Sequence, residues 1–83
     1  MSTSGRRTSK AIFRREYEEF RTRLVRARES AGLTQREAAQ RLGRSQSFVA
    51  KSETGERRVD VVELRQFAAT YGVPLEFFFG RRL

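Results

Sequence analysis

The 83-residue sequence contains no cysteine, no histidine and a single proline. Without cysteine and histidine it has no disulfide framework, no Cys/His zinc site, no thiol nucleophile and no His-based catalytic triad. Its longest apolar run is far shorter than the roughly 18 residues that a membrane span needs, and its basic N-terminus lacks the apolar stretch of a secretory signal. These absences argue against most enzyme classes, fit a reducing cytoplasm, and predict a chain that holds no metal ion or other cofactor.

Basic residues, in contrast, are plentiful. Lys and Arg number 18 against 10 Asp and Glu, which gives a formal net charge of +8. At 37% hydrophobic residues the chain can still fold, and its length allows one domain with a small core. Residues 1–15 alone contribute +5 of the excess, so much of the charge lies outside the expected core. The composition predicts a small basic domain whose partner is a polyanion.

Helical periodicity dominates the sequence, and no segment alternates with period two as a half-buried strand would. Residues 1–10 are small, polar and basic, and we expect them to form a disordered basic tail. Residues 11–83 form the domain, with helices expected over 12–31, 35–42, 45–52, 61–71 and 75–79. The predicted fold class is therefore all-α, a compact domain of five helices joined by short linkers.

Capping signals mark the ends of these helices. Thr34 and Asp60 are each followed three residues later by glutamate, the pattern of a capping box, and Ser45 is a further N-cap. Two short helices are separated only by Gly43–Arg44, where the glycine permits the positive φ of a tight turn. Ala39 is small where two such helices must cross closely. This is the geometry of a helix-turn-helix, whose second helix enters the major groove of DNA.

Further residues extend this motif at fixed spacing: Arg28, Gly32-Leu33-Thr34-Gln35, Ala39, Leu42-Gly43, Ser45-Gln46-Ser47, Val49, Glu53, Gly55-Glu56-Arg57-Arg58, Leu64, Ala68 and Gly72-Val73. In this order they resemble the XRE family of helix-turn-helix domains, which has the lambda-repressor-like five-helix fold. The resemblance covers about residues 20–79. Ser52 departs from it, because the family usually places an apolar core residue there. We expect Phe48 or Phe67 to fill that space, or the third helix to be less tightly anchored.

The resemblance implies roles for particular side chains. Those expected to read bases lie on the third helix: Gln46, Ser47, Lys51 and Phe48. Glutamine pairs with adenine and lysine with guanine in the major groove. Those expected to bind phosphates are Gln35, Arg44, Ser45, Thr54, Arg57 and Arg58. Arg28 and Glu53 are expected to form a structural salt bridge that braces the first helix against the third.

Three features have alternative interpretations. Phe48 either packs at the corner between the second and third helices or contacts a thymine methyl group. The run Phe77, Phe78 and Phe79 mostly builds the core, but one ring must face away on a helix, and an exposed ring suggests a dimer contact. The basic residues of the tail (Arg6, Arg7 and Lys10) form a solvated arm, or lie along phosphates or in the minor groove.

The predicted function is a sequence-specific regulator of transcription that binds double-stranded DNA, as a homodimeric repressor occupying its operator in the cytoplasm. The alternative is an antitoxin or accessory protein-interaction module on the same fold, which would bind a protein partner through the C-terminal aromatic helix and the first helix. We do not expect the protein to be an enzyme, because its sequence contains no phosphate-cradling glycine loop and no convincing carboxylate pair. A small-molecule substrate, a membrane contact and a sensing domain after residue 83 are not expected either.

Overall fold

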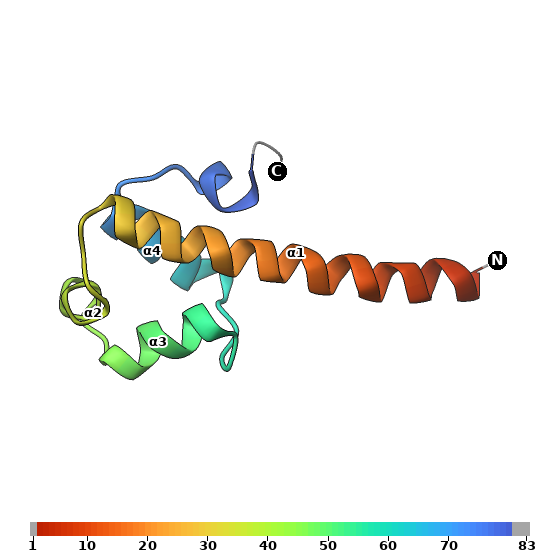
Figure 1. The fold of residues 1–83 in the computed structure, drawn as a ribbon, viewed down its shortest axis with the longest axis horizontal. Coiled ribbons are helices and arrows are strands. Elements are labelled where there is room, and N and C mark those ends of the chain that lie inside the picture. Colours follow the sequence, from red (N-terminus) through yellow and green to blue (C-terminus); the bar gives the residue numbers. More distant parts are fainter. Residues whose placement is uncertain (1, 81–83) are drawn as a thin grey trace.

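The computed structural model of the chain describes the backbone of residues 2–80 and the side chains of residues 13–80. Over this part the protein is all-α, as predicted. The order of elements is α1 (Ser2–Ser30), α2 (Gln35–Leu42), α3 (Gln46–Thr54), α4 (Val61–Tyr71) and the 3-10 helix η1 (Leu75–Phe79). In Figure 1, α1 crosses the molecule, α2 and α3 lie on one side of it, and η1 lies on the other. None of the described helices is long and apolar enough to cross a membrane.

The fifth helix differs in type from the prediction. It covers the expected residues 75–79, but it is a 3-10 helix. Its N-cap, Pro74, makes no side-chain capping hydrogen bond, and the amide of Phe77 donates to the carbonyl oxygen of Pro74 at 3.0 Å, which is an i to i+3 bond. Short runs of a few residues adopt this tighter helix because they hold too few α-type hydrogen bonds to prefer the wider one.

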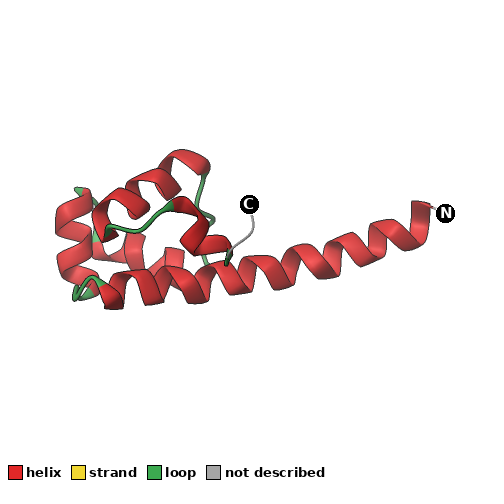
Figure 2. Ribbon diagram, turned by 90° about the horizontal axis from the view of Figure 1, so that it is seen from above, coloured by secondary structure: helices red, strands yellow, loops and turns green. Residues whose placement is uncertain are grey.

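The first helix begins earlier than the prediction. We expected a disordered tail over residues 1–10, whereas the structure continues α1 from Ser2. Extending a formed helix adds one hydrogen bond per residue fixed and needs no new nucleus, so the packed part of α1 can propagate outward. Figures 1 and 2 show this N-terminal part projecting beyond the other helices. The side chains of Arg6, Arg7 and Lys10 lie outside the described ones, and their proposed role as an arm remains a prediction.

The predicted caps are present. The hydroxyl of Thr34 and the carboxylate of Asp60 each accept from the backbone amide three residues on. The glutamate at that position in turn accepts from the backbone amide of the cap residue, so both capping boxes are complete. The hydroxyl of Ser45 accepts from the backbone of α3 in the same way. Helix α3 runs to Thr54, two residues further than expected, and ends at Gly55, whose φ of 90° is the left-handed conformation that favours glycine.

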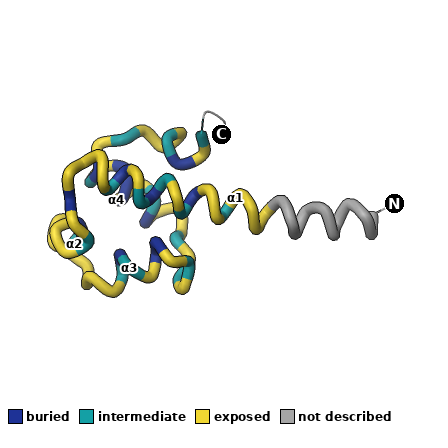
Figure 3. The backbone as a smooth tube through the Cα atoms, in the orientation of Figure 1, coloured by how far each residue is buried: buried dark blue, intermediate teal, exposed yellow. Residues whose placement is uncertain are grey.

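The core lies where the C-terminal half of α1 meets the other helices. Its buried side chains come from every element, as the dark segments of Figure 3 show. They are Phe20, Leu24, Ala27, Leu33, Ala38, Ala39, Val49, Phe67, Ala68, Tyr71 and Phe78. Helix α2 packs on α3 and α4, and α3 packs on α1. The inner faces of α2 and α3 are therefore covered, and their outer faces remain in solvent.

Candidate nucleic-acid interface

The outer face of α3 presents three polar side chains to solvent. Gln46, Ser47 and Lys51 are all exposed, and among the described residues no hydrogen bond involves their side chains. On the opposite face of the same helix Val49 is buried in the core. The packing of α3 therefore leaves the predicted base-reading side chains free to contact a ligand.

Two hydroxyls mark the ends of α3. At its start, Ser45 Oγ accepts from the amide of Phe48 at 3.1 Å. At its end, Thr54 Oγ1 donates to the carbonyl oxygen of Lys51 at 3.3 Å and accepts from the amide of Glu56 at 3.4 Å. Both residues are exposed, so both hydroxyls lie at the surface where we predicted phosphate contacts.

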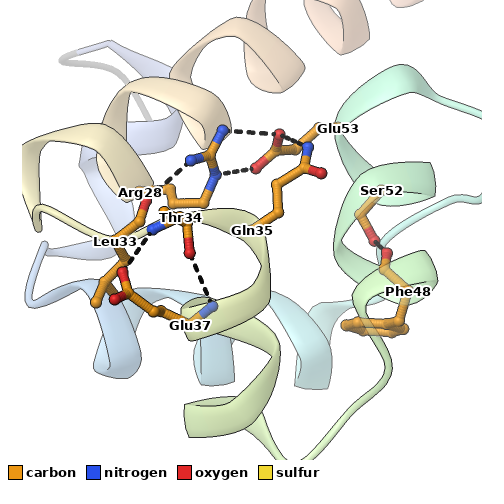
Figure 4. Close-up of polar contacts among 8 residues, drawn as sticks. All are labelled: Arg28, Leu33, Thr34, Gln35, Glu37, Phe48, Ser52 and Glu53. Carbon is orange, nitrogen blue, oxygen red and sulfur yellow. Dashed lines mark hydrogen bonds and ion pairs between the residues drawn. The ribbon is translucent and has the colours of Figure 1, made fainter.

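The predicted ion pair between Arg28 and Glu53 is present. Arg28 Nε donates to Glu53 Oε2 at 2.7 Å, and a second guanidinium nitrogen donates to Oε1 at 3.2 Å (Figure 4). The guanidinium also donates to the carbonyl oxygen of Leu33 at 2.9 Å. The hydrogen bond to Glu53 raises the pKa of Arg28, which therefore stays charged. The pair joins the C-terminal end of α1, the turn before α2 and the end of α3.

The structure gives Gln35 a different partner from the predicted phosphate. Its amide Nε2 donates to Glu53 Oε1 at 2.8 Å, so the side chain turns inward (Figure 4). The physical reason is that Glu53 is only 8% exposed, and a buried carboxylate needs donors for its oxygens. Arg28 and Gln35 together supply them. Sequence analysis missed this contact because the two residues are 18 positions apart.

Arg57 is likewise engaged within the domain, and its phosphate contact stays a prediction. Its guanidinium forms a two-pronged ion pair with Glu63, at 3.0 and 2.9 Å, and donates to Ser52 Oγ at 3.3 Å. The pair lowers the pKa of Glu63 and raises that of Arg57, because the hydrogen bonds favour both charged forms. The guanidinium is therefore held by α3 and α4, and the loop between them is fixed in place.

The buried serine explains how the domain departs from the family pattern. Ser52 is fully buried, and its hydroxyl donates to the carbonyl oxygen of Phe48 at 2.7 Å (Figure 4). The same hydroxyl accepts from Arg57 at 3.3 Å. A buried hydroxyl with both a donor and an acceptor partner carries no desolvation penalty for unmet hydrogen bonds. A serine at a position that is usually apolar indicated that a polar partner lies inside the domain, and sequence analysis did not identify Arg57 as that partner.

Phe48, in the first turn of α3, packs against Phe67 of α4, which gives it a structural role. Its ring is half-buried and stacks on Phe67, with centroids 5.8 Å apart and planes at 13°. The guanidinium groups of Arg44 and Arg57 lie over it at 4.4 and 4.3 Å. With these neighbours the ring is a platform for arginine, and its contact with a thymine methyl group stays a prediction. Arg44 itself is exposed beside the start of α3.

The loop after α3 is fixed to α1 by two further residues. The guanidinium of Arg58 lies 4.4 Å from the ring centroid of Tyr17, and the hydroxyl of Tyr17 accepts from the amide of Val59 at 3.1 Å. Arg58 remains exposed. Arg21, which sequence analysis did not single out, donates to the carbonyl oxygen of Glu53 at 3.2 Å and so places a cation near the C-terminal end of α3, where it is favourable.

The aromatic run at the C-terminus divides between core and surface. Phe78 is buried, Phe77 is half-buried, and Phe79 is 43% exposed. Of the three predicted dimer contacts, Phe79 is thus the ring that faces outward. Among the described side chains no three acidic residues gather closely enough to hold a metal ion.

The same arrangement of helices is found in known proteins. Residues 19–76 match the model of a helix-turn-helix domain family. A solved structure, described as an XRE-family like protein from Pseudomonas syringae pv. tomato str. DC3000, is 42% identical in sequence; the alignment covers 86% of this chain and 87% of that one, with a TM-score of 0.80. The chain belongs to the XRE family of helix-turn-helix proteins. No curated protein matches it.

Membership in the XRE family indicates that the protein is a DNA-binding regulator. In helix-turn-helix proteins in general, the second helix of the motif enters the major groove. The exposed face of α3 is the part of the described surface that this role requires. The Glu53 and Arg57 clusters hold the C-terminal end of α3 in position, and the Ser45 cap holds its start.

Proposed function

We propose that this XRE-family protein is a sequence-specific transcription repressor that binds double-stranded DNA as a homodimer and acts by occupying its operator. The observation that carries the proposal is the free outer face of α3, with Gln46, Ser47 and Lys51 exposed and no internal partner for them among the described residues. The rest of α3 is fixed by burial and hydrogen bonds, so these side chains start from a rigid base.

Gln46 and Ser47 lie in the first turn of α3, the end that reaches base edges in a helix-turn-helix. The amide of Gln46 can accept from N6 and donate to N7 of adenine, and Lys51 can donate to O6 or N7 of guanine. A well-formed contact of this kind contributes about 1–3 kcal/mol of discrimination against the wrong base. These residues would therefore carry the sequence preference.

Phosphate contacts fall to the exposed cations and hydroxyls around α3. Arg44 and Arg58 each stack on an aromatic ring of the domain, which limits their freedom before DNA arrives. Ser45 and Thr54 add hydroxyls at the two ends of the helix. Gln35 and Arg57 are left out of this set because their polar groups already have partners inside the domain. Such contacts release counterions, so affinity should fall steeply with salt.

In a homodimer two copies of α3 would sit about 34 Å apart, one turn of B-DNA, and the operator would be a pseudo-palindrome. Occupation of such a site near a promoter excludes polymerase, which is repression without a catalytic step. The protein would then act on chromosomal DNA in the cytoplasm.

The test begins with selection of duplexes from a random library at physiological salt by the full chain. We expect an enriched pseudo-palindrome. Gln46→Ala removes the contact from both half-sites, a loss of about 2–6 kcal/mol, so titration of that operator should show Kd raised about 30-fold or more and the preference lost at one base pair in each half-site. Gln66→Ala, which removes the same amide from an exposed position on α4, is the matched control and should bind as the unmodified protein does.

Two results would contradict the proposal. One is a library with no enriched sequence. The other is an equal loss of affinity for the operator and for unrelated DNA on changing Gln46, because that would make its contact independent of sequence.

A further inference from the structure

Basic residues recur on one side of α1 along most of its length. They are Arg7, Lys10, Arg14, Arg21 and Arg28, and successive ones are separated by three, four, seven and seven positions. At about 100° per residue these spacings keep all of them within an arc of about 60° around the helix axis. The glutamates of α1 fall outside that arc, with Glu18 the nearest to it. This side of the helix, which we call the basic stripe, is therefore positively charged.

The two members of the stripe nearest the core face the C-terminal end of α3. Arg28 pairs with Glu53 at 2.7 Å, and Arg21 donates to the carbonyl oxygen of Glu53 at 3.2 Å. Arg21 also lies against Gly55, because a Cβ atom at that glycine would be 3.0 Å from Nε of the arginine. The free face of α3 ends at the exposed Thr54. The basic stripe therefore begins beside the surface that we propose to meet DNA.

A further cation continues the line from α3 onto α1. Arg58, in the loop after α3, is exposed, and its guanidinium lies 4.4 Å from the ring centroid of Tyr17 and 5.6 Å from that of Phe13. Arg14 lies on the turn of α1 that carries these rings, and it is exposed as well. The ion pairs among the described side chains join other residues, so the charge of Arg14 is available to a ligand.

Beyond Arg14, α1 projects past the other helices toward its N-terminus (Figures 1 and 2). The backbone is helical from Ser2 onward, so the same spacing places positions 7 and 10 on the line of Arg14. In neither view does another helix cover this part of α1. The basic stripe thus runs from the end of α3 outward to a surface that is open to a ligand.

We propose that the basic stripe is a second DNA-contact element, in which Arg14, Lys10 and Arg7 bind phosphates beside the base pairs that α3 reads. A row of cations fits a polyanion with regularly spaced charges, and residues 1–15 carry +5 with no acidic residue. Since phosphates are alike at every base pair, these contacts add affinity without sequence preference. The inference rests on the proposed function and extends its DNA contacts from α3 to α1.

Two neighbouring arginines provide a matched pair for the test. Arg14 lies in the basic stripe, whereas Arg15 lies about 100° further round the helix and outside it. Both are exposed, and each is followed by a glutamate four positions later. Replacing either by glutamine therefore removes the same charge and the same helical neighbour pair. Circular dichroism should show that the two variants fold alike.

Binding of the full chain to the selected operator and to an unrelated duplex is then measured by fluorescence anisotropy at several salt concentrations. Each phosphate contact contributes about 0.9 to the steepness of log K against log salt. We expect Arg14→Gln to reduce that steepness by about 1 for each copy of the chain bound, and to weaken binding to both duplexes by a similar, several-fold factor. Arg15→Gln should leave the steepness unchanged. Adding Lys10→Gln to Arg14→Gln should reduce it again by about the same amount.

A helix-breaking variant tests whether the helical spacing matters. Ala11→Pro removes a backbone donor and distorts the helix at the preceding residues, so position 10 no longer shares the side of Arg14. In that variant we expect Lys10→Gln to leave the salt dependence unchanged and Arg14→Gln to keep its effect. A flexible tail would bind phosphates with or without the proline, and Lys10→Gln would then act equally in both chains.

Four results would overturn the inference. Equal effects of Arg14→Gln and Arg15→Gln would mean that only net charge matters, and no effect of Arg14→Gln would remove the contact. A loss confined to the operator would make the contact specific for bases, and an equal effect of Lys10→Gln with and without the proline would refute the helical stripe. Because the unrelated duplex reports phosphate contacts by itself, the test decides the inference even when no operator is selected. A chain that binds neither duplex would overturn both this inference and the proposed function.

Discussion

Replacing Arg57 with alanine tests whether this residue stabilises the domain or binds DNA. The change removes both hydrogen bonds to the carboxylate of Glu63 and the one to Ser52. It also removes the guanidinium from the ring of Phe48. Glu63 then remains buried without its cation, whereas the exposed surface of the domain changes little.

The expected loss of stability follows from these contacts. Removing one partner of a fully buried pair costs about 3–5 kcal/mol. Here the side chain of Arg57 is 31% exposed, and Glu63 still accepts from the amide of Asp60 at 3.1 Å, so about 2 kcal/mol is the appropriate figure. The lost cation–π contact adds about 0.5–1 kcal/mol. A total of about 2.5 kcal/mol lowers the melting temperature of a domain this size by about 10–20 °C.

Urea and thermal unfolding followed by circular dichroism measure this loss directly. Arg44→Ala is the control, because its guanidinium lies over the same ring but is exposed and forms no ion pair in the described structure. It should cost less than about 1 kcal/mol. A double-mutant cycle with Glu63→Gln should show coupling between Arg57 and Glu63.

One pattern of results would refute the reasoning. If Arg57→Ala melted within about 2 °C of the unmodified protein and yet, while folded, bound operator more weakly than Arg44→Ala does, the guanidinium would be a phosphate ligand and not an internal brace. We expect the reverse order of effects on both measurements.

Three further predictions concern other buried polar groups. Glu53→Gln removes the charge that Arg28 is paired with and should lower the free energy of unfolding by about 2 kcal/mol in urea titrations; an unchanged value would contradict the bracing role. Tyr71→Phe should leave stability unchanged or raise it by about 1 kcal/mol, because the hydroxyl is buried without a hydrogen-bond partner among the described residues, and a clear loss in the same assay would disprove this. Since Arg57 holds the pKa of Glu63 below its ordinary value, the pair stabilises the fold above the unfolded pKa of about 4.3. That contribution should be lost as pH falls toward the folded pKa, and Glu63→Gln should reduce this part of the pH dependence of unfolding; an identical pH profile would count against it.

Much of the fold could be predicted from the sequence because its signals are local. The capping boxes at Thr34 and Asp60 and the cap at Ser45 depend on residues only three positions apart, so the sequence shows both partners. The spacing of these caps defined the helix-turn-helix, and with it the exposed turn that carries Gln46 and Ser47. The ion pair of Arg28 with Glu53 came from family resemblance, since nothing local links two residues 25 positions apart.

The partners of the other polar side chains were decided by packing alone. With 18 basic residues in the chain, the sequence could not show which of them have partners inside the domain. Gln35 and Arg57 bind Glu53 and Glu63. A carboxylate buried by the meeting of helices must find donors, and only the three-dimensional arrangement shows which donors lie within reach. The helix ends and the polar face of α3 were thus determined by residues close together in the sequence. Which polar side chains bind partners inside the domain and which stay free at the surface was decided only when the helices packed together.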